Sequence, residues 1–154
     1  MNQEHLKCIL LVDDDEPTNF LSKMIVDQSG CTDHVQVEDS AERALQYLVE
    51  SSEHGYAPPA HLWPDIIFLD INMPAMNGWE FLEQYKHLTK KHERNVIIIM
   101  LTTSLNPDDE EKAYRSGAVT EFRQKPLTKE ILDEVLSNHF SIEKHACEYE
   151  AELS

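Results

Sequence analysis

Three continuous runs of apolar residues, at 8–12, 66–69 and 96–101, place the strongest constraint on how this chain can fold. Runs of this length between turn residues are typical of strands buried on both faces of a sheet. Two further segments, 34–38 and 119–122, alternate apolar and polar residues, which is typical of strands with one face in water. We therefore expect three central strands and two edge strands.

Segments with helical spacing of apolar residues follow each of these strands. The first has Pro17 in its first turn and is ended by Gly30. Asp15, just before it, is expected to serve the N-terminus of this helix rather than a metal. The apolar residues at helical spacing in this segment are Phe20, Leu21, Met24 and Ile25. The other helices are expected near residues 41–50, 79–88, 107–116 and 129–140.

Strands that alternate with helices form parallel sheets with helical crossovers. The predicted fold is therefore α/β, a doubly wound five-stranded parallel sheet of the flavodoxin-like type, with five helices on both faces. Placing the two alternating strands at the edges gives the strand order 2-1-3-4-5. Such sheets bind ligands beyond the carboxyl ends of their strands, near the point where the strand order reverses.

The 154 residues suit a single domain, which we expect to span residues 1–140. Within it, residues 51–63 are predicted to form a long loop. Residues 141–154 form an acidic C-terminal tail, in which apolar residues recur at helical spacing. This tail could extend the last helix, pack on a partner or fray, and the sequence leaves these alternatives open.

The net charge of −16 narrows the classes of partner. Binding to nucleic acid relies on clustered Lys and Arg, so no direct nucleic-acid partner is expected. The chain lacks an apolar run of about 18 residues and a signal-peptide pattern, so we expect no membrane span and a cytoplasmic location. Three cysteines without a CxxC motif indicate reduced thiols, which agrees with that location.

Chemically active side chains follow four of the five predicted strands. They are Asp13, Asp14, Asp15, Asp70, Thr102 and Lys125. Because parallel strands end at one edge of a sheet, we expect these side chains to converge, and a hard divalent cation would relieve the repulsion between the carboxylates. Oxygen ligands suit Mg²⁺, with Mn²⁺ as an alternative. An ammonium, a hydroxyl and such a cation are complementary to a phosphoryl group, and a carboxylate beside them can attack phosphorus.

Four segments, in this order, resemble the response-regulator receiver domains of two-component signalling. They are residues 9–15, residues 69–74 with Gly78, residues 101–104 and residues 125–126. The resemblance implies a stand-alone signalling module that is controlled by phosphorylation and has no DNA-binding output domain. It implies a receiver that promotes its own phosphorylation and dephosphorylation, not a turnover enzyme. The expected phosphoryl donor is a histidine kinase or a histidine phosphotransfer protein.

The resemblance also implies a role for each matching residue around the metal. Asp70 would be the phosphoacceptor. The metal ligands would be Asp14, Asp70 and the backbone carbonyl of Asn72, with Asp13 acting through water. Asn72 and Ser104 occupy positions that tune the hydrolysis of the acyl phosphate in this family.

Further roles implied by the resemblance concern the phosphoryl group and the output. Thr102 and Lys125 would contact the phosphoryl group, and the bond between Lys125 and Pro126 would be cis. Phe122 would change rotamer on phosphorylation. The signal would then reach a downstream protein through the face formed by the predicted helix at 107–116, the strand at 119–122 and the helix at 129–140.

Two other interpretations use the same residues. The first is a phosphatase resembling the haloacid dehalogenase superfamily, which also uses a strand-end Asp, Mg²⁺ and a Lys. Its DxDx[TV] signature is not met after either strand. In the segment that starts at Asp13, Pro17 stands where Thr or Val is needed, and in the segment that starts at Asp70, Asn72 replaces the second Asp. Turnover of a phosphate ester would distinguish that enzyme from a receiver. The second is a pseudo-receiver that binds partners without phosphorylation, and the intact set of strand-end residues argues against it.

Overall fold

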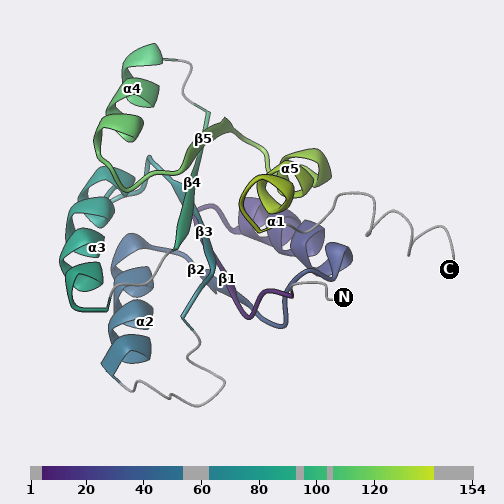
Figure 1. Cartoon of the computed structure of the whole chain (residues 1–154). Helices are drawn as coiled ribbons and strands as arrows, with labels where there is room; N and C mark the ends of the chain where they lie inside the picture. Colours follow the sequence, from purple (N-terminus) through teal and green to yellow (C-terminus); the bar gives the residue numbers. More distant parts are fainter. Residues whose placement is uncertain (1–4, 54–62, 93–95, 104–105, 141–154) are drawn as a thin grey trace, which may run out of the picture.

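A five-stranded parallel sheet with helices on both faces makes up the described part of the chain (Figure 1). The computed structural model describes residues 5–53, 63–92, 96–103 and 106–140. The strands pair in the order β2-β1-β3-β4-β5, which confirms the predicted order. Along the chain the elements are β1 (Ile9–Val12), α1 (Glu16–Ser29), β2 (Val35–Glu38), α2 (Ala41–Glu53), β3 (Ile66–Asp70), α3 (Gly78–His92), β4 (Ile97–Thr102), α4 (Pro107–Arg115), β5 (Glu121–Gln124) and α5 (Lys129–Phe140).

The register of the strands brings their carboxyl ends to one edge of the sheet. The central strands β1, β3 and β4 are almost entirely buried, and the edge strands β2 and β5 are partly buried, as their sequences predict. Asp70 at the end of β3 lies opposite Leu101 of β4. Thr102 at the end of β4 lies opposite Gln124 of β5. Residues at these ends therefore emerge side by side.

Two apolar cores hold the helices against the sheet. Successive strand residues point to opposite faces, so Leu10 packs in one core and Leu11 in the other. In Figure 1, α2, α3 and α4 lie on one side of the sheet, and α1 and α5 lie on the other. Phe81 of α3 is buried in the first core and Leu132 of α5 in the second. Burial of side chains of this size contributes roughly 1.5–3 kcal/mol each.

The ends of α1 are those that the sequence predicts. Asp15 is the N-cap, and its Oδ2 accepts a hydrogen bond from the Thr18 backbone N–H at 3.0 Å. Hydrogen bonds from Thr18 also hold the pKa of Asp15 below its ordinary value. Gly30 ends the helix with a φ of 67°, in the left-handed region that favours glycine. Asp15 thus serves the helix, as expected.

The buried face of α1 differs from the face that its apolar residues indicate. Asn19, Ser22 and Val26 are the buried residues. Asn19 faces inward, where its Nδ2 donates to the Asp13 carbonyl oxygen at 2.7 Å and so satisfies a backbone acceptor. Three large apolar side chains are exposed instead, and we name them the α1 apolar patch: Phe20 (64% exposed), Leu21 (55%) and Met24 (39%).

Three predicted boundaries are wrong by a few residues. α2 continues to Glu53, beyond the predicted end at residue 50, and α3 continues to His92, beyond residue 88. β5 begins at Glu121 rather than at residue 119. The Thr120 backbone N–H donates to the Ile98 carbonyl oxygen at 2.8 Å, just before β5 begins. Among the described residues, no helix is both long and apolar enough to cross a membrane. The part of the predicted loop at 54–62, the tail at 141–154 and Ser104 lie outside the described residues.

Candidate functional site

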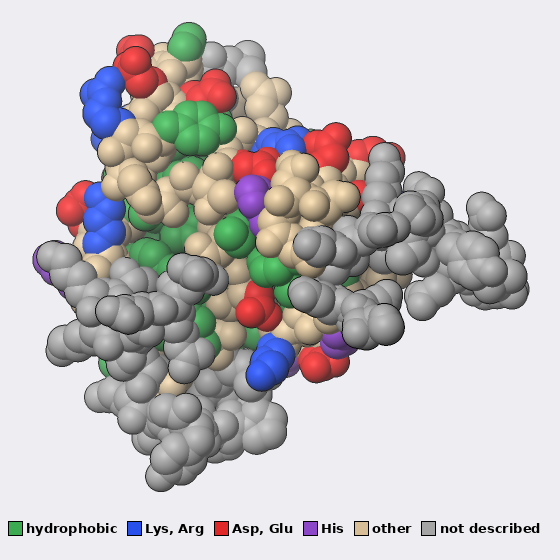
Figure 2. All heavy atoms as spheres, viewed as in Figure 1, with side chains coloured by type: hydrophobic (Ala, Val, Ile, Leu, Met, Phe, Trp, Pro, Cys, Tyr) green, Lys and Arg blue, Asp and Glu red, His purple; other side chains and the backbone are tan. Residues whose placement is uncertain are grey.

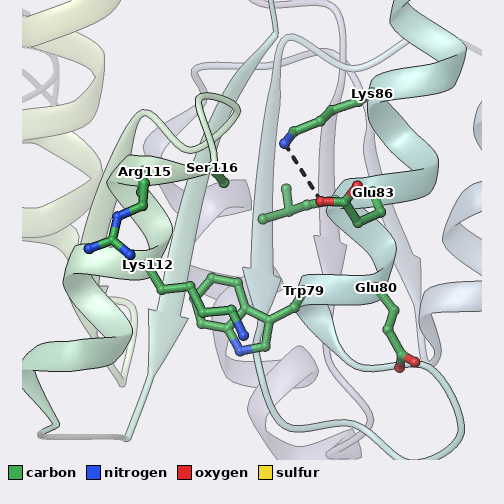
Figure 3. Close-up of a pocket in the computed structure, with 8 residues that line it drawn as sticks. Trp79, Glu80, Glu83, Lys86, Lys112, Arg115 and Ser116 are labelled. Carbon is green, nitrogen blue, oxygen red and sulfur yellow. Dashed lines mark ion pairs between the residues drawn. The ribbon is translucent and has the colours of Figure 1, made fainter.

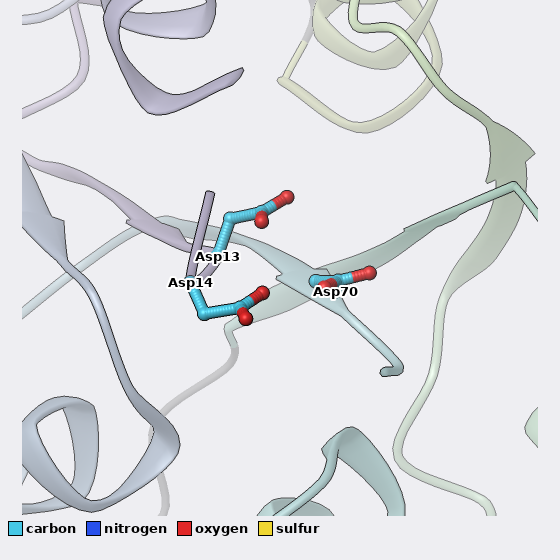
Figure 4. A group of neighbouring side chains, drawn as sticks. All are labelled: Asp13, Asp14 and Asp70. Atoms are coloured by element: carbon cyan, nitrogen blue, oxygen red, sulfur yellow. The ribbon is translucent and has the colours of Figure 1, made fainter. Parts of the chain in front are cut away.

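Three aspartates converge at the carboxyl edge of the sheet, as predicted (Figure 4). Asp13 and Asp14 follow β1, and Asp70 is the last residue of β3. One carboxylate oxygen from each aspartate lies within 4.8 Å of the other two. Asp13 and Asp70 are each 5% exposed, whereas Asp14 is exposed. The edge therefore holds two buried carboxylates and a third that faces solvent.

Lys125 lies between the two buried carboxylates. Its Nζ is 2.5 Å from Asp13 Oδ2 and 3.1 Å from Asp70 Oδ1. Because β5 ends one residue earlier, the edge strand delivers this ammonium group to the ends of the central strands. The peptide bond between Lys125 and Pro126 is cis, as the resemblance implies.

Thr102 completes the group of strand-end residues. It is the last residue of β4 and is completely buried. Its carbonyl oxygen accepts a hydrogen bond from the Lys125 backbone N–H at 2.9 Å. The ends of β4 and β5 are thus held together beside Asp70, and the predicted residues from four strands meet at one place.

Burial shifts the ionisation of the groups in this site. Burial raises the pKa of Asp70, the negative charge of Asp13 raises it further, and the charge of Lys125 opposes both effects. Burial lowers the pKa of Lys125, but its hydrogen bonds and charge interactions with Asp13 and Asp70 outweigh that effect and raise it overall. Asp70 is therefore a more basic carboxylate than an exposed one, beside a fixed cation. Such perturbed groups are characteristic of functional sites.

The groups that hold Asp13 in place were not predicted from the sequence. Asn19 supports the Asp13 carbonyl from α1, as described above. The Asp15 backbone N–H donates to Asp13 Oδ1 at 2.9 Å. The signal that could have found Asn19 is its spacing of three residues from Ser22, which places two small polar residues on one side of the helix.

Gly78 approaches the backbone of the site more closely than any other residue type could. It is the first residue of α3, and its N–H donates to the Ile71 carbonyl oxygen at 2.8 Å. A Cβ atom at this position would lie 2.6 Å from the Asp70 carbonyl oxygen. The sequence indicates Gly78 only as a break in regular structure, whereas in the structure it allows α3 to pack on the end of β3.

The remaining predicted residues lie at different distances from the carboxylates. The backbone of Asn72 hydrogen-bonds the Asp70 carboxylate, which lowers the pKa of Asp70 in opposition to burial. The Asn72 side chain itself is exposed. Phe122 is partly buried against the first core and lies opposite Met100 on β4. It therefore lies on the strand beside Thr102 and not among the aspartates.

The donor set of this site suits a hard divalent cation. It consists of carboxylate oxygens, with no sulfur or imidazole among the convergent groups. Mg²⁺ prefers one or two carboxylates and keeps other positions for water and phosphate oxygens. The two buried carboxylates, Asp13 and Asp70, and the exposed carboxylate of Asp14 supply such oxygen ligands, and the exposed side leaves room for water. The residues therefore fit the predicted Mg²⁺ ion.

Comparison with known proteins matches most of the chain to one protein family. Residues 9–137 match the family model for the response regulator receiver domain. A crystal structure of a two-component response regulator from Cytophaga hutchinsonii is similar, with a TM-score of 0.77 and 33% sequence identity. That alignment covers 87% of this chain and 96% of the Cytophaga chain.

Two curated proteins show the range of contexts in which similar sequences occur. Response regulator Rcp1 from Synechocystis sp. is 28% identical over 108 residues, which are 70% of this chain and 69% of Rcp1. A probable cyclic di-GMP phosphodiesterase from Vibrio cholerae is 30% identical over 143 residues, which are 90% of this chain. The chain spans only 28% of the length of that Vibrio protein.

Proposed function

This chain belongs to the response regulator receiver domains of two-component signalling, and we propose that Asp70 is the residue on which it is phosphorylated. Receiver domains are signalling modules rather than turnover enzymes, and they interact with histidine kinases and phosphotransfer proteins. One observation carries the proposal. Asp70 is a buried strand-end carboxylate in contact with Lys125 and within reach of Asp13 and Asp14.

Each residue of the site has a part in the proposed transfer. A carboxylate oxygen of Asp70 attacks the phosphorus of a phosphohistidine donor, and the bond between phosphorus and the imidazole nitrogen breaks. The Lys125 ammonium, which is 3.1 Å from Asp70 Oδ1, and the Thr102 hydroxyl would bind phosphoryl oxygens. Mg²⁺ or Mn²⁺, held by Asp14, Asp70 and the Asn72 carbonyl with Asp13 acting through water, would offset the charge of the carboxylates and of the phosphoryl group.

The test of the assignment is intact-mass measurement after incubation with acetyl phosphate and Mg²⁺. The wild-type chain should gain one phosphoryl group, and Asp70→Asn should gain none. Asp14→Ala, or EDTA added to the wild type, should abolish labelling because the cation is lost. Asp15→Asn is the matched control, since Asp15 caps α1 and should leave labelling unchanged. Equal labelling of the wild type and Asp70→Asn would refute the assignment.

We further propose that the phosphoryl donor docks on the α1 apolar patch. A donor must approach Asp70 from the carboxyl edge, and α1 begins at that edge, directly after the N-cap residue Asp15. Contiguous exposed apolar side chains are typical of surfaces that bind other proteins. Leu21→Glu should slow transfer from an autophosphorylated histidine kinase at least tenfold and leave labelling by acetyl phosphate unchanged. Tyr114→Glu, which alters an exposed apolar residue on α4, is the control and should leave both rates unchanged.

We propose that the output leaves through the face of α4, β5 and α5. Figure 2 shows hydrophobic side chains at the surface between α4 and β5, and Tyr114 of α4 is 49% exposed. A phosphoryl group that draws the Thr102 hydroxyl toward it would leave space behind Thr102 for Phe122 to turn inward. A shift of the equilibrium between the two Phe122 states from 1:99 to 99:1 needs about 5.5 kcal/mol. A few charge-assisted hydrogen bonds to the phosphoryl group, at roughly 1.5–3 kcal/mol each, are sufficient.

Amide NMR shifts with and without beryllofluoride, a phosphoryl mimic, would test this route. The wild type should show its largest shifts within 103–135, and Thr102→Ala should bind the mimic but respond weakly. Shifts that avoid these residues, or a full response of Thr102→Ala, would exclude the route.

The extent of the receiver unit and its location are part of the same proposal. The family match ends at residue 137, close to the end of α5, which supports a receiver unit of residues 1–140 followed by a tail at 141–154. We propose a cytoplasmic location, in line with the reduced thiols that the sequence indicates. Removal of residues 141–154 should leave urea unfolding and labelling with acetyl phosphate unchanged. A loss of stability in urea or of labelling on truncation would show that the tail belongs to the folded unit.

A further inference from the structure

A groove of about 460 Å³ lies between α3 and α4 (Figure 3), and none of the three aspartates lines it. Trp79 and Leu82 of α3 supply its apolar lining. Lys112 of α4 reaches across, and its Nζ lies 4.6 Å from the centre of the Trp79 ring. This volume lies within the range of roughly 300–1,000 Å³ that is usual for pockets that bind small ligands, and it can hold a single large side chain.

The charge of this groove is opposite to that of the whole chain. Three of the 13 Lys and Arg side chains line it, namely Lys86, Lys112 and Arg115. Among the described residues, two of the 29 Asp and Glu side chains do so, namely Glu80 and Glu83. Cations are therefore concentrated here on a chain whose net charge is −16.

Glu80 does not offset these cations. Its Oε1 accepts a hydrogen bond from the Asn77 backbone N–H at 2.9 Å, which commits the carboxylate to the N-terminus of α3. Figure 3 shows the Glu80 side chain pointing away from Lys112 and Arg115. Of the two acidic residues that line the groove, Glu83 is then the one near a cation, with its Oε2 3.7 Å from Lys86 Nζ.

The partners of the groove cations can be exchanged at little cost. Lys86 pairs with Glu83, and Arg115 Nη2 lies 2.8 Å from Glu111 Oε1. Both are short-range pairs along a single helix with large exposed fractions, and such pairs contribute little to stability. Carboxylates from another molecule can therefore replace Glu83 and Glu111 while an apolar side chain between them contacts Trp79.

We propose that the groove between α3 and α4 binds an acidic segment of a partner protein in which carboxylates flank a large apolar side chain. The carboxylates would bind Lys86, Lys112 and Arg115, and the apolar side chain would pack on Trp79 and Leu82. Nucleic acid is a poorer occupant, because a polyanion longer than the groove meets the acidic remainder of the surface. The groove shares α4 with the proposed output face but is lined by α3 on its other side. We expect it to bind the segment whether or not Asp70 is phosphorylated.

The probe for the test is a pool of acetylated, amidated peptides of sequence Glu-Glu-Φ-Glu-Glu, where Φ is Leu, Phe or naphthylalanine. Naphthylalanine replaces Trp because it has no indole N–H of its own. The indole N–H resonance of Trp79 is followed by NMR in the unphosphorylated protein and is assigned with Trp79→Phe. The pool should shift this resonance saturably. A peptide with alanine at Φ should bind at least fivefold more weakly.

Matched charge variants separate a specific site from general attraction. Lys112→Glu should weaken binding of the pool at least tenfold. Lys23→Glu changes the net charge equally on α1, where Lys23 pairs with Asp27, and should change affinity less than twofold. No shift of the Trp79 indole at millimolar peptide, equal losses in the two variants, or equal binding of the alanine peptide would each overturn the proposal. Repeating the titration with Asp70→Asn keeps this result independent of the phosphorylation assignment.

Discussion

Replacement of Gly78 by alanine is expected to weaken both the fold and the phosphorylation site. A Cβ at this position would lie 2.6 Å from the Asp70 carbonyl oxygen and 3.0 Å from Ile71 Cα. Both atoms belong to the backbone, so no side-chain rotation can relieve the contact. Either the N-terminus of α3 moves away from the sheet, or the backbone that carries Asp70 shifts.

Two opposing terms set the size of the effect of Gly78→Ala. Alanine is favoured over glycine in a helix by roughly 0.5–1 kcal/mol. Insertion of an extra methyl group into a packed region costs about 1–3 kcal/mol. Contact with backbone atoms places the cost near the upper end of this range, so we expect the free energy of unfolding to fall by about 1.5–2.5 kcal/mol.

Urea unfolding and the rate of labelling by acetyl phosphate would measure the two effects of Gly78→Ala. Labelling should slow because a displaced Asp70 no longer lies in register with Lys125. Gly30→Ala is the control, since its φ of 67° makes alanine unfavourable by about 1–2 kcal/mol but no atom lies within 4 Å of the new Cβ. It should lose stability and label at the wild-type rate. Wild-type stability and labelling in Gly78→Ala would refute the argument.

Two further predictions concern charge and pH. In EDTA at pH 7, Asp70→Asn should raise the free energy of unfolding measured in urea. Burial and the charge of Asp13 raise the pKa of Asp70, so its ionised form opposes folding above that pKa. The gain should shrink as the pH falls and the wild-type carboxyl becomes neutral. Burial opposes ionisation of Glu121, but hydrogen bonds from His139, Arg123 and Asn138 outweigh it and lower the pKa of Glu121. Its stabilisation is therefore present above its unfolded pKa and lost as the pH falls through the folded pKa, so Glu121→Gln should unfold more readily at pH 7 and lose less stability on acidification.

The strand-end site could be predicted because one rule connects sequence to space for all its members. In a parallel sheet every strand ends at the same edge, so Asp70, Thr102 and Lys125 need only be recognised as the residues that follow strands. Continuous apolar sequence marks the central strands without knowledge of their partners. Errors of one or two residues in a boundary, as in β5, leave this conclusion unchanged because Lys125 follows the strand in either case.

The buried face of α1 could not be predicted from the same kind of pattern. Phe20, Leu21 and Met24 have helical spacing, and so do Asn19 and Ser22 with Val26. Apolar periodicity favours the first set, but the structure buries the second. The choice depends on the Asp13 carbonyl, which requires a donor that only a tertiary contact reveals.

The cluster of cations in the groove between α3 and α4 could not be predicted from the sequence either. Lys86 and Lys112 are 26 positions apart, on helices that follow different strands, and nothing near either residue in the sequence indicates that they face one groove. Each has an acidic residue three or four positions away, which by itself is typical of a solvated helix face. Only the packing of α4 beside α3 brings the cations together over Trp79. A site at the end of a sheet follows from strand order, whereas a site between helices depends on side chains whose spacing in the sequence carries no information about their contact.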